Sequence, residues 1–92
     1  MSERQHEQPN LTLLGRAIAK IRQERGLGVG ELAATTGIEH ARIQELEAGR
    51  LDPDYELLVA LAEGLGVRPS ALVIRAEALL AEDRGAEVDP SS

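Results

Sequence analysis

The chain has 92 residues, of which 42% are hydrophobic and 28% charged, a composition typical of one small globular domain. It contains no cysteine, which excludes disulfides and thiolate metal sites. Tyr55 is its only aromatic residue, which excludes the stacking surfaces of single-strand and RNA-binding modules. Acidic residues outnumber basic ones by 16 to 10, and the whole net charge of −6 falls in residues 51–92. An acidic chain is a poor non-specific ligand for polyanions.

Both ends of the chain are polar. Residues 1–10 have no apolar run, so we expect no signal peptide there, and residues 82–92 are acidic and end in Pro-Ser-Ser. We expect two solvated tails around a single domain, residues 11–81. No apolar run approaches the ~18 residues of a membrane helix, so the sequence predicts a cytoplasmic protein that makes no membrane contact.

Between the tails, apolar residues recur at steps of three and four, which predicts helices and leaves no place for a sheet. Asn10 or Thr12 is expected to cap the first helix and Asp54 the fourth, and glycines are expected to end the first four helices. The predicted helices are residues 11 or 13 to 25, 29–36, 39–48, 55–65 and 69–81. The expected fold class is therefore all-α.

The most informative stretch is residues 28–49, in which a turn at Gly37 separates two short helices. This arrangement describes a helix-turn-helix, with the motif over about residues 28–48. Ile38, Ile43 and Leu46 are expected to fasten the second of these helices to the core. The side chains left pointing outward are His40, Ala41, Arg42, Gln44 and Glu45. A helix presented in this way fits the major groove of B-DNA.

These positions resemble the Cro/repressor-like, or XRE, helix-turn-helix family over about residues 14–74. The resemblance is carried by Leu14-Gly-Arg-Ala-Ile-Ala, Glu31-Leu-Ala33, Gly37-Ile38, Ile43-Gln-Glu-Leu-Glu-Ala-Gly49, Leu57-Leu58 and Leu65-Gly-Val67. It implies a five-helix, lambda-repressor-like bundle, with helices two and three as the helix-turn-helix. It further implies sequence-specific binding to double-stranded DNA, frequent homodimerisation and transcriptional regulation. It also implies that Arg22 pairs with Glu47 between the first and third helices.

The DNA-binding residues expected from the motif are Glu39, His40, Ala41, Arg42, Gln44, Glu45 and Arg50. The chain departs from the family at Gly28 and Val29, where the family usually has Ser or Thr followed by a phosphate-contacting Gln. It departs again at Glu39, where Ser or Thr commonly caps the recognition helix. Few phosphate contacts predict modest affinity and a shallow dependence on salt.

The fifth predicted helix is apolar on more than one face, because Ala71-Leu-Val-Ile74 and Ala78-Leu-Leu-Ala81 both lie within it. One face should cover the bundle, and the other predicts a symmetric homodimer unless the C-terminal tail folds back over it. The residues expected at the dimer surface are Val73, Ile74, Leu79 and Leu80. Tyr55 is expected to pack against the bundle.

The sequence bears on three functional classes, namely an enzyme, a DNA-binding regulator and a protein–protein interaction module. An enzyme is disfavoured, because the two histidines are far apart and no serine stands beside a base. No clustered ligand spacing indicates a metal, and no cofactor is expected. The leading hypothesis is a sequence-specific transcriptional regulator, associated with the nucleoid, that binds a two-fold symmetric operator in double-stranded DNA as a homodimer. The alternative is a protein–protein interaction module of the same fold, with DNA binding weakened or lost.

Overall fold

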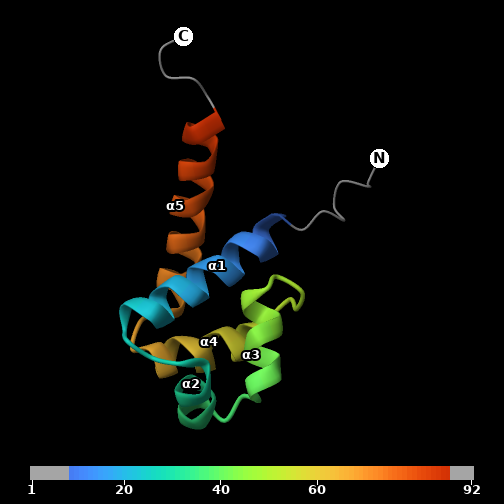
Figure 1. Cartoon of the computed structure of the whole chain (residues 1–92), viewed down its shortest axis with the longest axis vertical. Helices are drawn as coiled ribbons and strands as arrows, with labels where there is room; N and C mark the ends of the chain where they lie inside the picture. The colour runs from blue at the N-terminus through green and yellow to red at the C-terminus, as the bar shows by residue number, and fades with distance from the viewer. Residues whose placement is uncertain (1–8, 88–92) are drawn as a thin grey trace.

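The structure is a computed structural model that describes residues 9–87. In this range it consists of α1 (Pro9–Glu24), α2 (Val29–Thr36), α3 (His40–Glu47), α4 (Tyr55–Leu65) and α5 (Pro69–Glu87), with no strand among the residues described. The helices α2, α3 and α4 gather on one side of α1, and α5 crosses α1 and extends beyond the rest of the bundle (Figure 1). The predicted all-α, five-helix fold is confirmed.

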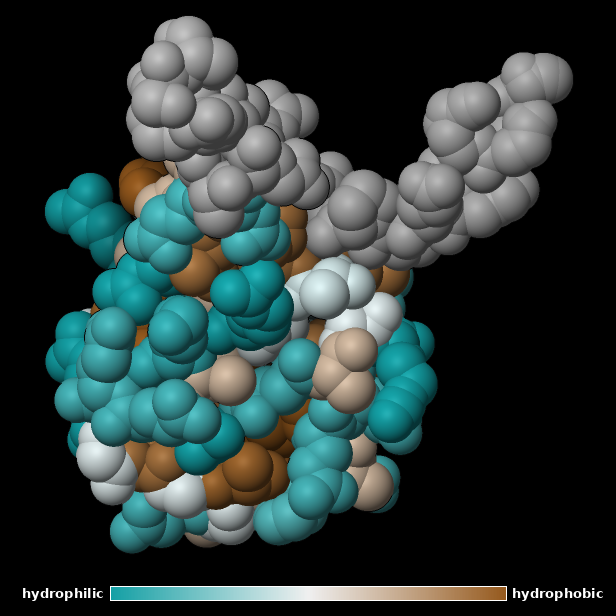
Figure 2. Space-filling view, turned by 45° about the horizontal axis from the view of Figure 1, so that its top comes forward, coloured by the Kyte–Doolittle hydropathy of each residue, from teal (hydrophilic) through white to brown (hydrophobic). Residues whose placement is uncertain are grey.

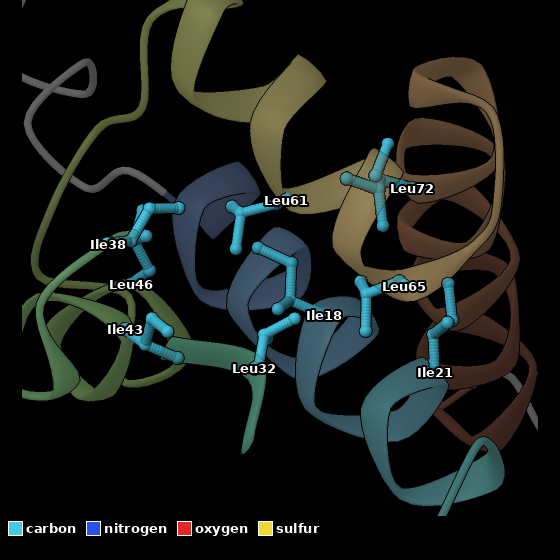
Figure 3. Packing of buried hydrophobic residues seen from close by; sticks show 10 residues of the cluster. Ile18, Ile21, Leu32, Ile38, Ile43, Leu46, Leu61, Leu65 and Leu72 are labelled. Carbon is cyan, nitrogen blue, oxygen red and sulfur yellow. The ribbon is translucent and has the colours of Figure 1, made fainter. Parts of the chain in front are cut away.

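Every helix contributes to one hydrophobic core. Its largest fully buried side chains are Ile18, Leu32, Ile43, Leu46, Leu61, Leu65 and Leu72, which converge from all five helices (Figure 3). Burial of a side chain of this size stabilises a fold by roughly 1.5–3 kcal/mol. The short helices α2 and α3 are thus held by packing on α1 and α4, since eight-residue helices are marginal alone.

The first helix begins earlier than expected. Residues 10 and 12 were predicted to cap it, but α1 starts at Pro9 and includes both of them, so the capping prediction is wrong. Proline suits the first helical position because its ring presets φ and its missing N–H has no intrahelical acceptor there. The predicted N-terminal tail is therefore helical at residues 9 and 10, and residues 1–8 lie outside those described.

The last helix corrects two predictions, one by its length and the other by its packing against α1. The acidic tail was predicted from residue 82, but α5 continues to Glu87, and residues 88–92 lie outside those described. Leu79 was predicted at a dimer surface, but it is 2% exposed and packs with Leu13 and Ala17 of α1 in a second core cluster. The pattern of α5 did not show that α1 covers this far turn of the helix.

A pair of charged side chains also joins α1 to α5. Nη1 and Nη2 of Arg75 donate to the two carboxylate oxygens of Glu24 at 2.9 and 3.0 Å. This hydrogen bonding lowers the pKa of Glu24 and raises the pKa of Arg75. Because the folded-state pKa of Glu24 lies below its ordinary value, the pair favours folding above that ordinary value. The contribution is lost as the pH falls through the lowered pKa.

Candidate nucleic-acid interface

The turn between α2 and α3 is built from local hydrogen bonds. Gly37 adopts the left-handed conformation, with φ 78°, and its N–H donates to the carbonyl of Ala33 at 2.8 Å. The hydroxyl of Thr36 donates to the carbonyl of Leu32 at 2.8 Å and accepts from the N–H of Ile38 at 3.1 Å. Ile38 is buried, so the turn is fixed at both its backbone and its core side. The angle between the two helices is therefore set by the sequence of the turn.

The start of α2 is closed by a residue that sequence reasoning missed. The N–H of Gly28 donates to a carboxylate oxygen of Glu31 at 2.8 Å. The signal was present, because a Glu three residues after the N-cap is one half of a capping box. The carboxylate occupies this N–H, so it is not free to meet a phosphate in the conformation described.

The helix α3 is anchored to α1 by an ion pair. Nε and Nη2 of Arg22 donate to the two carboxylate oxygens of Glu47 at 2.7 and 3.0 Å, and Nη1 donates to the carbonyl of Leu27 at 2.9 Å. Both charged side chains are only 13% exposed. Hydrogen bonding to Glu47 raises the pKa of Arg22. The pair that the resemblance implied is thus present, and it fixes the axial position of α3.

One surface of α3 faces outward. Its core side is formed by Ile43 and Leu46, which are 0% and 2% exposed. The predicted site residues on its outer side are all exposed, namely Glu39, His40, Ala41, Arg42, Gln44 and Glu45. Arg50 is exposed just beyond the end of the helix. His40 lies beside the first turn of α2, since a Cβ built on Gly30 would be 4.0 Å from its ring.

The charge of this region is unusual for a surface that would face phosphates. Residues 28–54 contain two basic residues, Arg42 and Arg50, against six acidic ones, a net charge of −4. Nε of Arg50 lies 3.8 Å from a carboxylate oxygen of Glu45, and the two side chains are 63% and 51% exposed. Ion pairs this exposed contribute about 0–1 kcal/mol, so a phosphate could replace Glu45 as the partner of Arg50 at little cost.

The family model described as a helix-turn-helix domain matches residues 13–76 of this chain. The match covers more than half of the 92 residues, including all of α2, α3 and α4. The chain belongs to the Cro/repressor-like helix-turn-helix family.

This helix-turn-helix protein is similar to known regulators. An uncharacterized HTH-type transcriptional regulator of Sinorhizobium fredii, y4dJ, is 38% identical over 61 residues, which are 66% of this chain and 79% of the relative. The clp gene regulator ClgR of Corynebacterium glutamicum superimposes with a TM-score of 0.79 at 28% identity, over 85% of this chain and 83% of ClgR. The relatives are thus transcriptional regulators.

A third similarity concerns the fold alone. The restriction-modification controller protein C.AhdI of Aeromonas hydrophila superimposes with a TM-score of 0.66 at 24% identity. The superposition covers 67% of this chain and 94% of C.AhdI. A nearly complete match to a smaller chain indicates that the helical bundle itself is the unit that the two proteins share.

The helix-turn-helix protein also exposes large apolar side chains away from α3. Among the described residues these are Tyr55, Val73 and Ile74, which are 72%, 44% and 62% exposed. The expectation that Tyr55 packs against the bundle is wrong, because the first residue of α4 points away from the core. Elsewhere, on the face drawn in Figure 2, hydrophilic side chains predominate and hydrophobic surface forms patches between them.

The described residues contain neither a cluster of metal-ligating side chains nor a single membrane-spanning helix. In residues 9–87, no group of three or more His, Cys, Asp or Glu side chains could hold a metal ion. No single helix in this range is long and apolar enough to cross a membrane. Tyr55–Leu65 and Pro69–Asp83 meet that test only as a pair, which is bent by 92°.

Proposed function

We propose that this protein is a sequence-specific transcriptional regulator that binds double-stranded DNA in the cytoplasm as a homodimer. The observation that supports this most is the outward surface of α3, which is held rigidly by Ile43, Leu46 and the Arg22–Glu47 pair while its other side chains stay in solvent. A fixed helix with a free outer surface is what entry into a major groove requires.

The exposed residues divide into two roles. Arg42, Gln44 and His40 carry donors that can reach base edges or the nearest phosphates. Arg50, together with backbone N–H groups, would hold phosphates and so position α3. Glu45 can face DNA favourably where it accepts from the amino group of a cytosine. The acidic side chains would thus oppose binding at most sequences, which increases selectivity and lowers overall affinity.

The proposal is tested by selecting bound fragments from a random DNA pool with the full chain at low salt. We expect a palindrome to be enriched, with half-sites about one helical turn apart, because a two-fold dimer presents its two α3 helices at related positions. A pool in which no sequence is enriched would contradict sequence-specific binding.

The role of Arg42 is tested on the selected site by fluorescence anisotropy. Arg42→Ala should weaken binding by about 1–3 kcal/mol if the side chain reads a base, and should relax the preference at one position of each half-site. Lys20→Ala is the matched control, since Lys20 is an exposed cation on α1 outside the proposed interface. Equal binding by wild type and Arg42→Ala would remove Arg42 from the interface.

The acidic surface supports a second candidate function. Five of the six carboxylates in residues 28–54 are exposed, all except Glu47, and they would favour a basic protein partner over DNA in an interaction module with the same fold. The two functions are separated by the same selection. A chain that enriches no DNA at low salt but binds one protein stoichiometrically would be such a module.

A further inference from the structure

We infer that two copies of the chain form a homodimer around Val73. The exposed Tyr55 ring of each copy, the knob, inserts into a hollow between α1 and α5 of the other copy. The inference rests on the homodimer of the proposed function and names the surface that forms it. It keeps Val73 and Leu80 from the dimer surface that the sequence predicted, adds Tyr55 and residues of α1, and excludes Leu79, which is buried within one copy.

The knob is Tyr55, the first residue of α4. It is 72% exposed and is the only aromatic residue of the chain. An isolated aromatic ring in water leaves apolar area uncovered, and tyrosine is enriched at interfaces because its ring can be buried while its hydroxyl stays paired or wet. Apolar residues also lie around Tyr55, because it lines a shallow hollow with Leu58, Pro69 and Val73.

The hollow that would receive the ring lies between α1 and α5. It is lined by Leu13, Leu14, Val73, Ala76, Glu77 and Leu80, and its volume is about 210 Å³. This is below the ~300 Å³ at which pockets for small-molecule ligands begin, but it is wide enough for a side chain. Its wall is aliphatic apart from Glu77, so an inserted ring would meet apolar atoms.

Val73 belongs to both features, since it lines the hollow beside Tyr55 and the hollow beside Leu80. A two-fold axis that passes Val73 at right angles to α5 would make the two α5 helices antiparallel, and each knob would then face the hollow of the other copy. Such an isologous contact uses the same patch twice and closes on itself. Ile74, which the sequence also assigned to the dimer surface, lines the hollow on the other side of α5 and lies outside this contact.

The charges at the two ends of the patch are complementary. Arg68 lines the hollow beside Tyr55, and Glu77 lines the hollow that would receive the ring. In antiparallel helices that meet at Val73, Glu77 of one copy lies opposite position 69 of the other, next to Arg68. Among the side chains that the structure describes, residues 11–83, neither Arg68 nor Glu77 forms an ion pair. The patch therefore matches itself in charge as well as in shape, which favours a second copy over a partner of a single charge.

The apolar part of the inference is tested with the full chain by sedimentation equilibrium. We expect a dimer at tens of micromolar for wild type, and a shift to monomer for Tyr55→Ala and for Val73→Glu. Ala78→Glu is the matched control and should stay dimeric. It makes the same charge change as Val73→Glu at an exposed position of the same helix, but Ala78 lines the hollow on the other side of α5, with Ile21 and Arg75.

The orientation is tested by exchanging the two charges, which uses exposed positions and spares the core. Arg68→Glu and Glu77→Arg should each weaken dimerisation about tenfold or more, because each places like charges opposite one another. The double variant should return to within about threefold of wild type, since the pair is re-formed in reverse. Circular dichroism of each variant establishes that the fold is kept.

Three results would contradict the proposed interface. A monomeric wild type, a dimer unaffected by Val73→Glu, or a double charge variant no better than the singles would overturn the inference. DNA selection with the same proteins separates this result from the proposed function. If DNA is enriched but Val73→Glu stays dimeric, the proposed function holds and this interface is wrong. If Val73→Glu is monomeric but the wild type enriches no DNA, this interface holds and the proposed function is wrong.

Discussion

Gly15 lies where α1 crosses α3. A Cβ at this position would overlap the carbonyl oxygen of Leu46 and come within 2.5 Å of that of Glu47. These neighbours are backbone atoms and cannot rotate away, so any side chain would push α3 off α1. The absence of one side chain thus permits the close approach at which Arg22 reaches Glu47.

Gly15→Ala should therefore destabilise the fold by about 1–3 kcal/mol, the usual cost of overpacking, although alanine is the better helix former. Gly30→Ala is the control, because no atom lies closer than 4.0 Å to a Cβ built there. It should be neutral or stabilising by up to about 1 kcal/mol. Urea denaturation measures both, and equal stability of the two variants would contradict the close approach.

Among the helices, α5 differs most from what the sequence predicted. Its first half covers the main core through Leu72, and its second half packs on α1 through Leu79, with Nη1 of Arg16 lying 3.4 Å from a carboxylate oxygen of Asp83. The ion pair is exposed and contributes little, so this half of α5 is held mainly by buried Leu79, with half-buried Ala76 and Leu80 packed beside it. Helix α5 can thus present Val73 on a surface that α1 keeps rigid.

Leu79→Ala should cost about 2–5 kcal/mol of unfolding free energy, because it leaves a cavity between α1 and α5. Leu80→Ala removes the same atoms from a half-buried position and should cost clearly less. Denaturation at several protein concentrations distinguishes loss of stability within a copy from loss of the dimer. A larger effect at Leu80 than at Leu79 would show that the second half of α5 packs differently.

The net charge of −6 governs how the whole molecule would meet DNA. Only Arg42 and Arg50 provide full positive charge in residues 28–54, so a dimer would neutralise about four phosphates. The remaining acidic surface repels DNA at long range and slows association.

The affinity for the selected site should therefore fall with salt along a log–log slope of about −3.6. Between 50 and 200 mM salt the dissociation constant should rise on the order of 100-fold, measured by anisotropy. Arg50→Ala should reduce the slope by about 2 units per dimer, one per copy. A wild-type slope twice as steep would mean that cations outside residues 28–54, such as Arg16, also contact the DNA.

The sequence alone determined the two helices of the helix-turn-helix and the start of α4. Their signals are local: Gly37 needs a positive φ, Asp54 accepts from the N–H of Leu57 at 2.9 Å, and apolar residues repeat at helical steps. Such signals depend on a few neighbouring residues and therefore survive without knowledge of the fold. The exposure of α3 followed from the same pattern, because its apolar positions leave one side for solvent.

Only the tertiary structure decided which side chains of α5 are buried and whether Tyr55 is exposed. An apolar residue is buried or exposed according to which helix covers it, and the pattern of α5 is nearly the same on both sides. The structure places α1 over Leu79 and leaves Tyr55 72% exposed, the reverse of what the sequence suggested. The reason is that this choice depends on contacts between segments more than 40 residues apart, which periodicity within one helix does not encode.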